Sequence, residues 1–238
     1  MLQACLNGGW KKDHHIAVPL TITELVRDAS SVRAAGADEL HIHVRASDGA
    51  ETLEPDAVRQ TLEAVRAIVP DMPIGVGTGA WIAPGGRARH DDMQNWTVKP
   101  NYASVNLNEE DAPDVIALLT GMGVGIEAGL WSTQDARRFV DEIDFDTCLR
   151  VLVEMPDVEG VEAKTEAAAV ISMLEKAGCN LPVLLPGQGQ SVWPCVDMAW
   201  ERGLSTRIGF EDTFLLSDGS LAPDNAALVE AAKALNFV

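Results

Sequence analysis

The chain has 238 residues, of which 47% are hydrophobic, and a formal net charge of −18 at pH 7. This length is sufficient for one large core, so we expect a single domain over residues 1–238. A charge this negative argues against nucleic acid as a partner and favours solubility. It also makes any local gathering of basic side chains informative.

The cysteines and the apolar segments indicate a cytoplasmic protein. Four cysteines form no CxxC pair and no regular framework, which is typical of reduced, mostly buried thiols. No apolar run reaches transmembrane length, and the first residues lack the pattern of a signal peptide. We therefore expect no membrane partner.

The hydrophobic pattern predicts strands that alternate with helices along the whole chain. The expected strands are 2–6, 41–45, 72–79, 102–107, 124–128, 148–153, 181–185 and 206–210. The expected helices are 21–35, 56–69, a short one at 91–96, 112–122, 133–143, 161–177, 192–202 and 225–235. A long loop, 84–90, should precede the third helix.

Apolar strands that alternate with helices imply parallel βα units whose sheet is covered on both faces. Eight such units in this length match a (β/α)8 TIM barrel. A doubly wound open sheet is the competing fold. The glycines after the first strand do not fit GxGxxG and no acidic residue ends the second strand, which argues against a dinucleotide-binding fold.

The second expected strand carries two histidines on one face. Apolar residues alternate with His41, His43 and Arg45, and a strand repeats its facing every two residues. Two neighbouring imidazoles are costly to bury unless something binds them, and imidazole suits zinc and related divalent ions. We therefore favour a metal site over a hydrogen-bonded polar layer without metal.

The eighth expected strand should bring a carboxylate to the same place. Arg207 and Glu211 share one face by the period of two, and Glu211 lies at the carboxyl end, as His43 does. In a closed barrel the eighth and second strands flank the first, so Glu211 can reach a metal held by His41 and His43. Three protein ligands leave an open position, which is typical of a catalytic site. The alternative for Glu211 is an ion pair with Arg207.

Asp212 would then project beside the metal, where its carboxylate can move protons. Its alternative role is to cap the next helix. His14, His15 and His90 are expected to be solvated loop histidines rather than ligands.

Further polar and basic residues fall at the strand ends, where function sits in a barrel. On so acidic a chain, basic loop residues indicate an anionic substrate or a phosphate-bearing cofactor, although exposed loops collect charge in any protein. The basic candidates are Lys11, Lys12, Arg45, Arg87 and Arg89. The polar candidates, for substrate binding or for capping the barrel top, are Thr78, Ser104, Asn106 and Glu127.

These motifs resemble the β-keto acid cleavage enzymes, which include the 3-keto-5-aminohexanoate cleavage enzymes. The resemblance rests on HxHxR at residues 41–45 and on RxGxED at 207–212, and it extends through PLTITE at 19–24 and PGQG at 186–189. It covers most of the chain in order.

The resemblance implies a zinc-dependent (β/α)8 barrel, commonly a homotetramer, that converts a β-keto acid and acetyl-CoA into acetoacetate and a new acyl-CoA. The implied zinc ligands are His41, His43 and Glu211, and the implied acid–base pair is Asp212 with Arg207. Hydroxyl residues at the ends of the third and fourth strands would hold the keto acid carboxylate, and Glu127 resembles the glutamate of the family's fifth strand. These hydroxyl residues are Thr78 and Ser104.

The chain departs from the family's usual pattern in two places. Family members usually carry Thr-Gly-Ala-Glu after the first strand, where this chain has Asn-Gly-Gly-Trp at 7–10, and often have Asp after HxHxR, where Ala46 stands here. We therefore expect a retained metal site with altered substrate recognition. The competing functions are another metal-dependent barrel hydrolase or aldolase-type lyase that uses no CoA, and a catalytically silent binding barrel.

Overall fold

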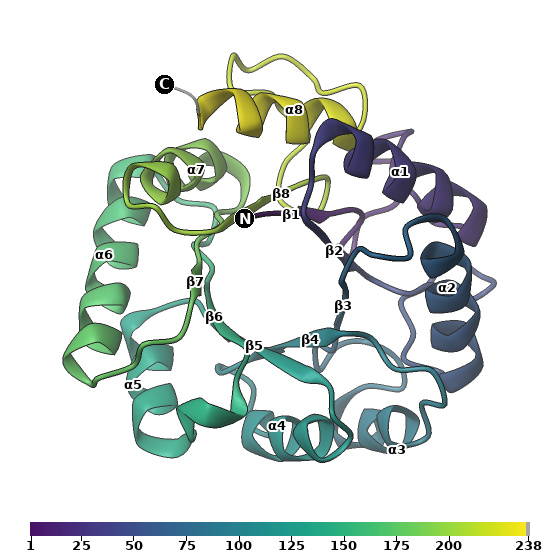
Figure 1. The fold of residues 1–238 in the computed structure, drawn as a ribbon, viewed down its shortest axis with the longest axis horizontal. Coiled ribbons are helices and arrows are strands. Elements are labelled where there is room, and N and C mark those ends of the chain that lie inside the picture. The colour runs from purple at the N-terminus through teal and green to yellow at the C-terminus, as the bar shows by residue number, and fades with distance from the viewer. Residues whose placement is uncertain (237–238) are drawn as a thin grey trace. The chain divides into compact units, whose positions relative to one another are not determined.

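The computed structural model describes residues 1–236, in which strands and helices alternate (Figure 1). The strands are β1 Leu2–Cys5, β2 Glu39–Ile42, β3 Ile74–Gly77, β4 Tyr102–Asn106, β5 Gly125–Leu130, β6 Arg150–Val153, β7 Val183–Leu184 and β8 Thr206–Ile208. The α-helices are α1 Ile22–Ala35, α2 Pro55–Ile68, α3 Arg89–Gln94, α4 Ala112–Gly121, α5 Thr133–Glu142, α6 Gly160–Lys176, α7 Val192–Glu201 and α8 Asn225–Leu235. Short 3-10 helices are η1 Gly86–Ala88, η2 Phe145–Thr147 and η3 Gly189–Ser191.

The strands form one sheet in the order β7-β6-β5-β4-β3-β2-β1-β8. A parallel bridge between Leu184 of β7 and Ser205, which directly precedes β8, links the two ends of this order. The fold is therefore a (β/α)8 barrel, as predicted, and the doubly wound alternative is wrong. No helix among residues 1–236 has the length and apolar character needed to cross a membrane.

The chain falls into two compact units, of which the first comprises Met1–Asn101 and the residues from Ile208 onward. Here β1 pairs with β2, and β2 with β3, all in parallel. Helix α1 packs against both α2 and α8. It begins with a capping box between Thr21 and Glu24, which satisfies backbone N–H groups of its first turn.

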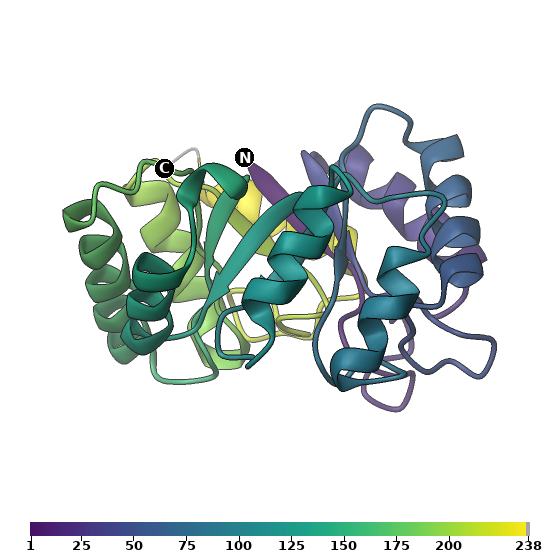
Figure 2. The same ribbon diagram turned by 90° about the horizontal axis from the view of Figure 1, so that it is seen from below.

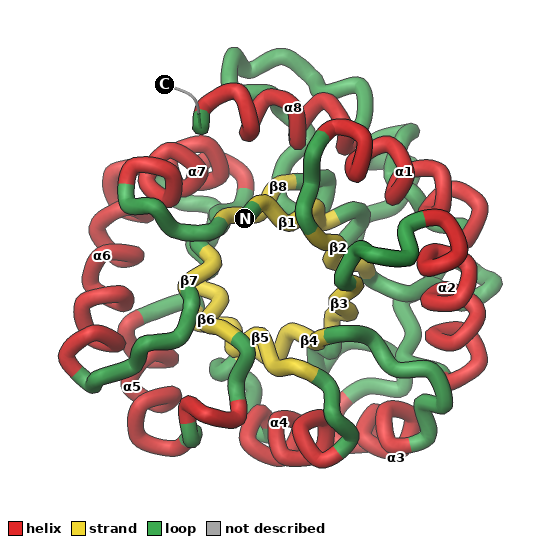
Figure 3. The backbone as a smooth tube through the Cα atoms, viewed as in Figure 1, coloured by secondary structure: helices red, strands yellow, loops and turns green. Residues whose placement is uncertain are grey.

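The second unit is Tyr102–Arg207, in which β4, β5, β6 and β7 pair in parallel. Helix α6 packs against α5 and α7. Within each unit the helices run alongside the strands (Figure 2) and lie on the outer side of them (Figure 3). Strands β1, β3 and β6 are buried at every residue, which explains the near-continuous apolar runs in the sequence.

Two strands end earlier than the sequence pattern predicts. Strand β2 stops at Ile42, so His43 lies beyond it, and Arg45 instead forms an antiparallel bridge with Glu51. Strand β8 stops at Ile208, so the period of two does not extend to Glu211. That part of the facing argument was wrong, because the chain turns at Gly209, whose carbonyl accepts from two later backbone N–H groups.

The prediction of a loop over residues 84–90 was also partly wrong. It contains η1, and α3 already begins at Arg89, before the predicted start at residue 91. The remaining elements match their predicted ranges to within about two residues at most ends, which is the usual disagreement in assigning element boundaries.

Candidate active site

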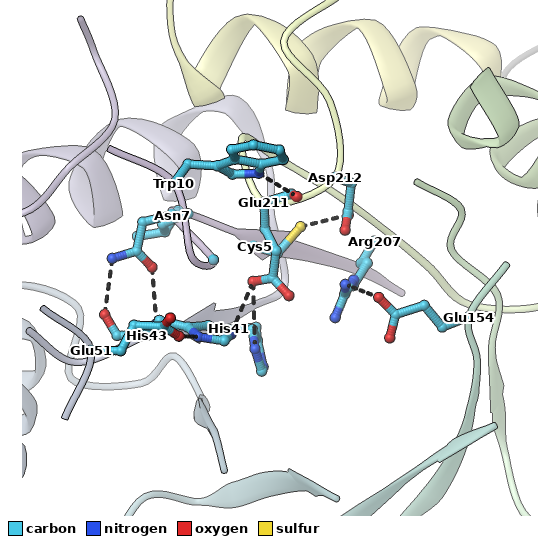
Figure 4. A network of polar contacts seen from close by, with 12 residues as sticks. Cys5, Asn7, Trp10, His41, His43, Glu51, Glu154, Arg207, Glu211 and Asp212 are labelled. Atoms are coloured by element: carbon cyan, nitrogen blue, oxygen red, sulfur yellow. Dashed lines mark hydrogen bonds and ion pairs between the residues drawn. The ribbon is translucent and has the colours of Figure 1, made fainter. Parts of the chain in front are cut away.

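Two imidazoles and one carboxylate converge beyond the carboxyl ends of β2 and β8. Oε2 of Glu211 lies 3.5 Å from Nε2 of His41 and 3.6 Å from Nε2 of His43. Figure 4 shows the Glu211 carboxylate directed at both rings. The period of two therefore failed for Glu211, yet the turn after β8 still brings its carboxylate to the two histidines.

This cluster fits a divalent metal. One ligand atom from each of the three residues lies within 4.8 Å of the others. Ligands held at about 2.0–2.1 Å by one tetrahedral ion lie roughly 3.3–3.4 Å apart, which is close to the two distances above. The donor set of two imidazoles and one carboxylate is also one that zinc and its neighbours accept. The three residues would therefore hold such an ion.

The backbone of His43 is fixed by Asn7, a fully buried residue that follows β1. The Asn7 side chain accepts a hydrogen bond from the His43 N–H at 2.9 Å and donates one to the His43 carbonyl at 2.9 Å. On β3, Gly77 leaves the room that the ring needs, because a Cβ there would lie 2.5 Å from Nε2 of His43. Neither residue was a predicted site residue.

The second ring nitrogen of His43 is also held. Its Nδ1 lies 2.5 Å from Oε1 of Glu51, a residue that the sequence analysis missed. Burial lowers the pKa of His43, but the charge and hydrogen bonds of Glu211 and Glu51 outweigh it and raise the pKa to about 9. The two carboxylates that flank this ring therefore favour positive charge here, either as a proton on the ring or as a cation bound to its neutral form.

The loop at residues 7–10, which retains the second residue of the family pattern as Gly8 but ends in Trp10, has a structural role around Glu211. Gly8 has φ +48°, and a Cβ there would lie 2.6 Å from Cγ of Glu211. The Trp10 indole N–H donates to the Glu211 carbonyl at 2.9 Å, and the indole packs edge-on against Phe214. This loop therefore braces the backbone of Glu211 (Figure 4).

Arg45 is 8% exposed, and its guanidinium points to the same loop. It donates hydrogen bonds to the carbonyls of Gly8 and Trp10, the latter at 3.2 Å. Burial lowers the pKa of Arg45, although the negative charges of Glu51 and Glu211 act in the opposite direction. The structure therefore gives Arg45 a part in holding the loop after β1.

Asp212 is buried beside the cluster, with 4% of its surface exposed. Its Oδ2 accepts a hydrogen bond from the thiol of Cys5, the last residue of β1, at 2.7 Å. The next helix, α8, is capped by Asp224, so the alternative that Asp212 is a helix cap was wrong. All four cysteines are buried, and none belongs to a disulfide in the part of the chain that the structure describes.

Arg207 belongs to the second unit, where a second carboxylate missed by the sequence analysis holds it. Nη2 of Arg207 donates to Oε1 of Glu154 at 2.7 Å, and both side chains are buried. The same oxygen accepts from Nε2 of Gln188 at 2.9 Å. Glu154 directly follows β6, so its place at a strand end was the available signal. Arg207 thus pairs with Glu154.

The polar candidates lie in both units. Thr78 follows β3 in the first unit and is 1% exposed. Ser104 and Asn106 lie on β4 in the second unit, where Oδ1 of Asn106 accepts from the Trp131 indole at 3.2 Å. Glu127, on β5, is fully buried, and its Oε1 accepts from Nε of Arg150 at 2.6 Å. Glu127 therefore takes part in a buried ion pair.

The basic candidates differ in exposure. Lys11 and Arg87 are exposed, while Nζ of Lys12 lies 2.7 Å from Oε1 of Glu24. Arg89 is fully buried at the start of α3, and its guanidinium donates to backbone carbonyls. Its expected place in an exposed loop was therefore wrong, and its contacts are structural.

His15 likewise differs from expectation. It is 7% exposed and stacks against Phe214, with the ring of Phe210 at 4.4 Å between centroids. It therefore belongs to an aromatic cluster and is not a solvated loop histidine.

With this geometry established, comparisons with known proteins decide the family. A sequence profile described as beta-keto acid cleavage enzyme matches residues 1–236. The chain belongs to this family. The 3-keto-5-aminohexanoate cleavage enzyme of Fusobacterium nucleatum is 27% identical over 231 residues, covering 92% of this chain and 84% of that protein. The 3-oxoadipate:acetyl-CoA acetyltransferase of Cupriavidus necator is 26% identical over 242 residues, covering 94% and 84%.

Solved structures support the fold of this family member. The apo structure of ObcA superposes with a TM-score of 0.67 at 16% identity, covering 92% of this chain but 61% of ObcA, less than two thirds of that protein. The tryptophan synthase alpha chain of Legionella pneumophila superposes with a TM-score of 0.65 at 14% identity, covering 100% and 91%. At these identities the likeness concerns the barrel fold alone.

Proposed function

We propose that this member of the beta-keto acid cleavage enzyme family is a zinc-dependent enzyme that uses acetyl-CoA to cleave a small β-keto acid. A keto acid R–CO–CH2–COO⁻ and acetyl-CoA give R–CO–S–CoA and acetoacetate, so the acyl group R–CO moves to CoA and the acetyl group takes its place. The observation that carries the proposal is the convergence of His41, His43 and Glu211. The names of two relatives, a keto acid cleavage enzyme and an acetyl-CoA acetyltransferase, support the reaction class.

The proposed metal site supplies one element of this chemistry. A divalent ion held by the three residues would act as a Lewis acid toward the ketone and carboxylate oxygens of the keto acid. Carbon–carbon cleavage also needs a group that moves a proton. Asp212 is buried next to the ligand Glu211, and the Cys5 thiol orients its carboxylate. We assign proton transfer to Asp212.

Arg207 is proposed to stabilise the anionic carboxylate or enolate during cleavage, because a preorganised cation lowers the energy of developing negative charge. Its ion pair with Glu154 and the bond from Gln188 to the same carboxylate fix the guanidinium in place. Glu154 is thus a positioning residue for Arg207.

Substrate recognition completes the proposal. Thr78, Ser104 and Asn106 are proposed to bind the keto acid carboxylate, with Arg45 and Glu127 shaping the site through the contacts described above. Lys11, Lys12 and Arg87 are proposed to meet the CoA phosphates, whereas the buried contacts of Arg89 remove it from this set. By family resemblance we propose a cytoplasmic homotetramer.

An isotope experiment tests the reaction. Metal-loaded protein is incubated with acetyl-CoA carrying ¹³C in its acetyl group and with a panel of β-keto acids. We expect the label to appear in acetoacetate and a new unlabelled acyl-CoA to form with at least one keto acid. If acetyl-CoA is never consumed while the protein binds zinc and hydrolyses an ester or amide, a metallohydrolase should replace this proposal.

A further inference from the structure

We propose that Glu51 is a positioning residue of the metal centre, which orients His43 and strengthens its bond to the metal through a hydrogen bond to Nδ1. The inference rests on the proposed function, because it concerns the ion that His41, His43 and Glu211 would hold. The chemical class of the ligand is a divalent cation of the zinc type, bound through imidazole and carboxylate.

The contact between Glu51 and His43 is short and sheltered. Nδ1 of His43 and Oε1 of Glu51 are 2.5 Å apart, and the two side chains are 7% and 14% exposed. The other ring nitrogen, Nε2, faces Oε2 of Glu211 at 3.6 Å. A carboxylate accepts hydrogen bonds, so it fixes the proton of neutral His43 on Nδ1. The lone pair of Nε2 is then directed toward the cluster, as a metal ligand requires.

Glu51 is itself held in place by a hairpin that follows His43. Arg45 and Glu51 pair as an antiparallel bridge, and the backbone N–H of Ala46 donates to the carbonyl of Ala50 at 2.8 Å. The indole of Trp81 also hydrogen-bonds the Glu51 side chain. The hairpin thus brings the Glu51 side chain next to the ring of His43, which precedes it by eight positions in the sequence. The carboxylate therefore needs no rearrangement to meet the ring.

The charge of Glu51 also suits a divalent ion. Neutral His41 and His43 bring no charge to the cluster, whereas Glu211 and Glu51 bring one negative charge each. Glu211 would place its negative charge in direct contact with the cation, and Glu51 would act through the imidazole. Partners of this kind raise the basicity of a histidine ligand, and their loss typically weakens metal binding by about 10- to 100-fold.

Metal affinity tests the inference without any assay of turnover. The dissociation constant for zinc is measured by competition with a chelator for the wild type, Glu51→Gln and Glu51→Ala, and the visible spectrum of the cobalt-loaded proteins is recorded. Asp48→Asn is the matched control, because Asp48 lies in the same hairpin and its side chain caps the backbone N–H of Ala50. This control removes one negative charge near the site but leaves the contact with His43 intact.

We expect Glu51→Gln to weaken zinc binding by about 10- to 100-fold, and Glu51→Ala to weaken it further because alanine cannot accept the Nδ1–H bond. Asp48→Asn should stay within about twofold of the wild type. Thermal unfolding of the metal-free proteins identifies any variant that fails to fold. If Glu51→Ala fails to fold, the zinc affinity of Glu51→Gln, which keeps the shape of the side chain, tests the role of Glu51.

The outcomes separate this inference from the proposed function. If the wild type binds one zinc ion but Glu51→Gln binds it as tightly as Asp48→Asn, with an unchanged cobalt spectrum, the role of Glu51 is wrong and the metal centre stands. If the wild type itself binds no zinc, the metal centre and the role of Glu51 are both wrong.

Discussion

The thiol of Cys5 donates a hydrogen bond to the carboxylate of Asp212 across 2.7 Å, although the two residues are 207 positions apart in the sequence. Cys5 ends β1 and is fully buried, while Asp212 lies in the turn after β8. The backbone supports the same approach, because the N–H of Glu211 donates to the Cys5 carbonyl at 3.3 Å. Strand β1 thus orients the proposed acid–base group beside a proposed metal ligand.

Replacement of Cys5 should therefore affect turnover more than metal binding. A hydrogen bond to a charged group contributes about 1.5–3 kcal/mol, so Cys5→Ala should lower kcat by about tenfold or more. Cys5→Ser retains a donor of similar size and should restore most of the loss. Steady-state kinetics on metal-loaded proteins make the comparison. Equal kcat values for the wild type and Cys5→Ala would show that the contact does not serve catalysis.

Asp212→Asn should keep its metal but lose most of its activity. General acid–base groups contribute roughly a hundred- to ten-thousand-fold, and asparagine cannot exchange a proton at neutral pH. Elemental analysis gives the metal content, and acetyl-CoA consumption gives kcat. Activity close to that of the wild type would remove Asp212 from the mechanism.

Gly77→Ala should weaken metal binding, because the new Cβ would lie 2.5 Å from the proposed ligand atom Nε2 of His43. Gly121→Ala is the matched control, since a Cβ at this end of α4 meets nothing within 4 Å. The ring of His43 is held at Nδ1 and through its backbone, so we expect a loss in zinc affinity of at least about tenfold. Chelator competition measures it, and equal affinity of the two variants would contradict the geometry.

Asp28 gives the first unit a pH-dependent stability. Burial raises the pKa of Asp28 from its usual 3.8 to about 6, although a hydrogen bond from Asn225 opposes the shift. Between these values the folded state binds the proton more tightly than the unfolded state, so this carboxyl favours folding less as the pH rises. Asp28→Asn abolishes the titration.

The free energy of unfolding of Asp28→Asn, relative to the wild type, should therefore increase by about 1–2 kcal/mol between pH 4 and pH 7. Denaturant unfolding at several pH values measures this difference. Glu230→Gln, at an exposed position on α8, is the control and should show no such trend. A constant difference for Asp28→Asn across the range would mean that Asp28 titrates normally.

The sequence predicted the barrel because its elements obey local rules. Apolar runs mark the buried strands, and a residue pattern such as the capping box of Thr21 and Glu24 marks the start of a helix. The histidine pair could be found for the same reason, since alternation with apolar residues indicates the facing of a strand. The predicted extent of the strands was wrong, because β2 ends before His43 and β8 ends before Glu211, yet both side chains still reach the cluster.

The residues that support the site could not be predicted, because their roles depend on contacts between distant segments. Asn7 holds the backbone of His43 from the end of another strand, and Glu51 reaches its ring through a hairpin. Glu154 meets Arg207 from a strand end 53 positions earlier in the sequence. A place near a strand end was the one signal for Asn7 and Glu154, and other polar residues share that place. Arg89 was wrongly predicted to lie in an exposed loop, because the local sequence does not distinguish a buried arginine from an exposed one.

The metal content of His41→Ala plus His43→Ala tests most directly the claim that one divalent ion is held by these histidines and Glu211. The wild type and the double variant are loaded with zinc, passed over a desalting column and analysed for metal and protein. We predict close to one zinc ion per chain for the wild type and close to none for the double variant. Stoichiometric zinc retained by the double variant would contradict the account.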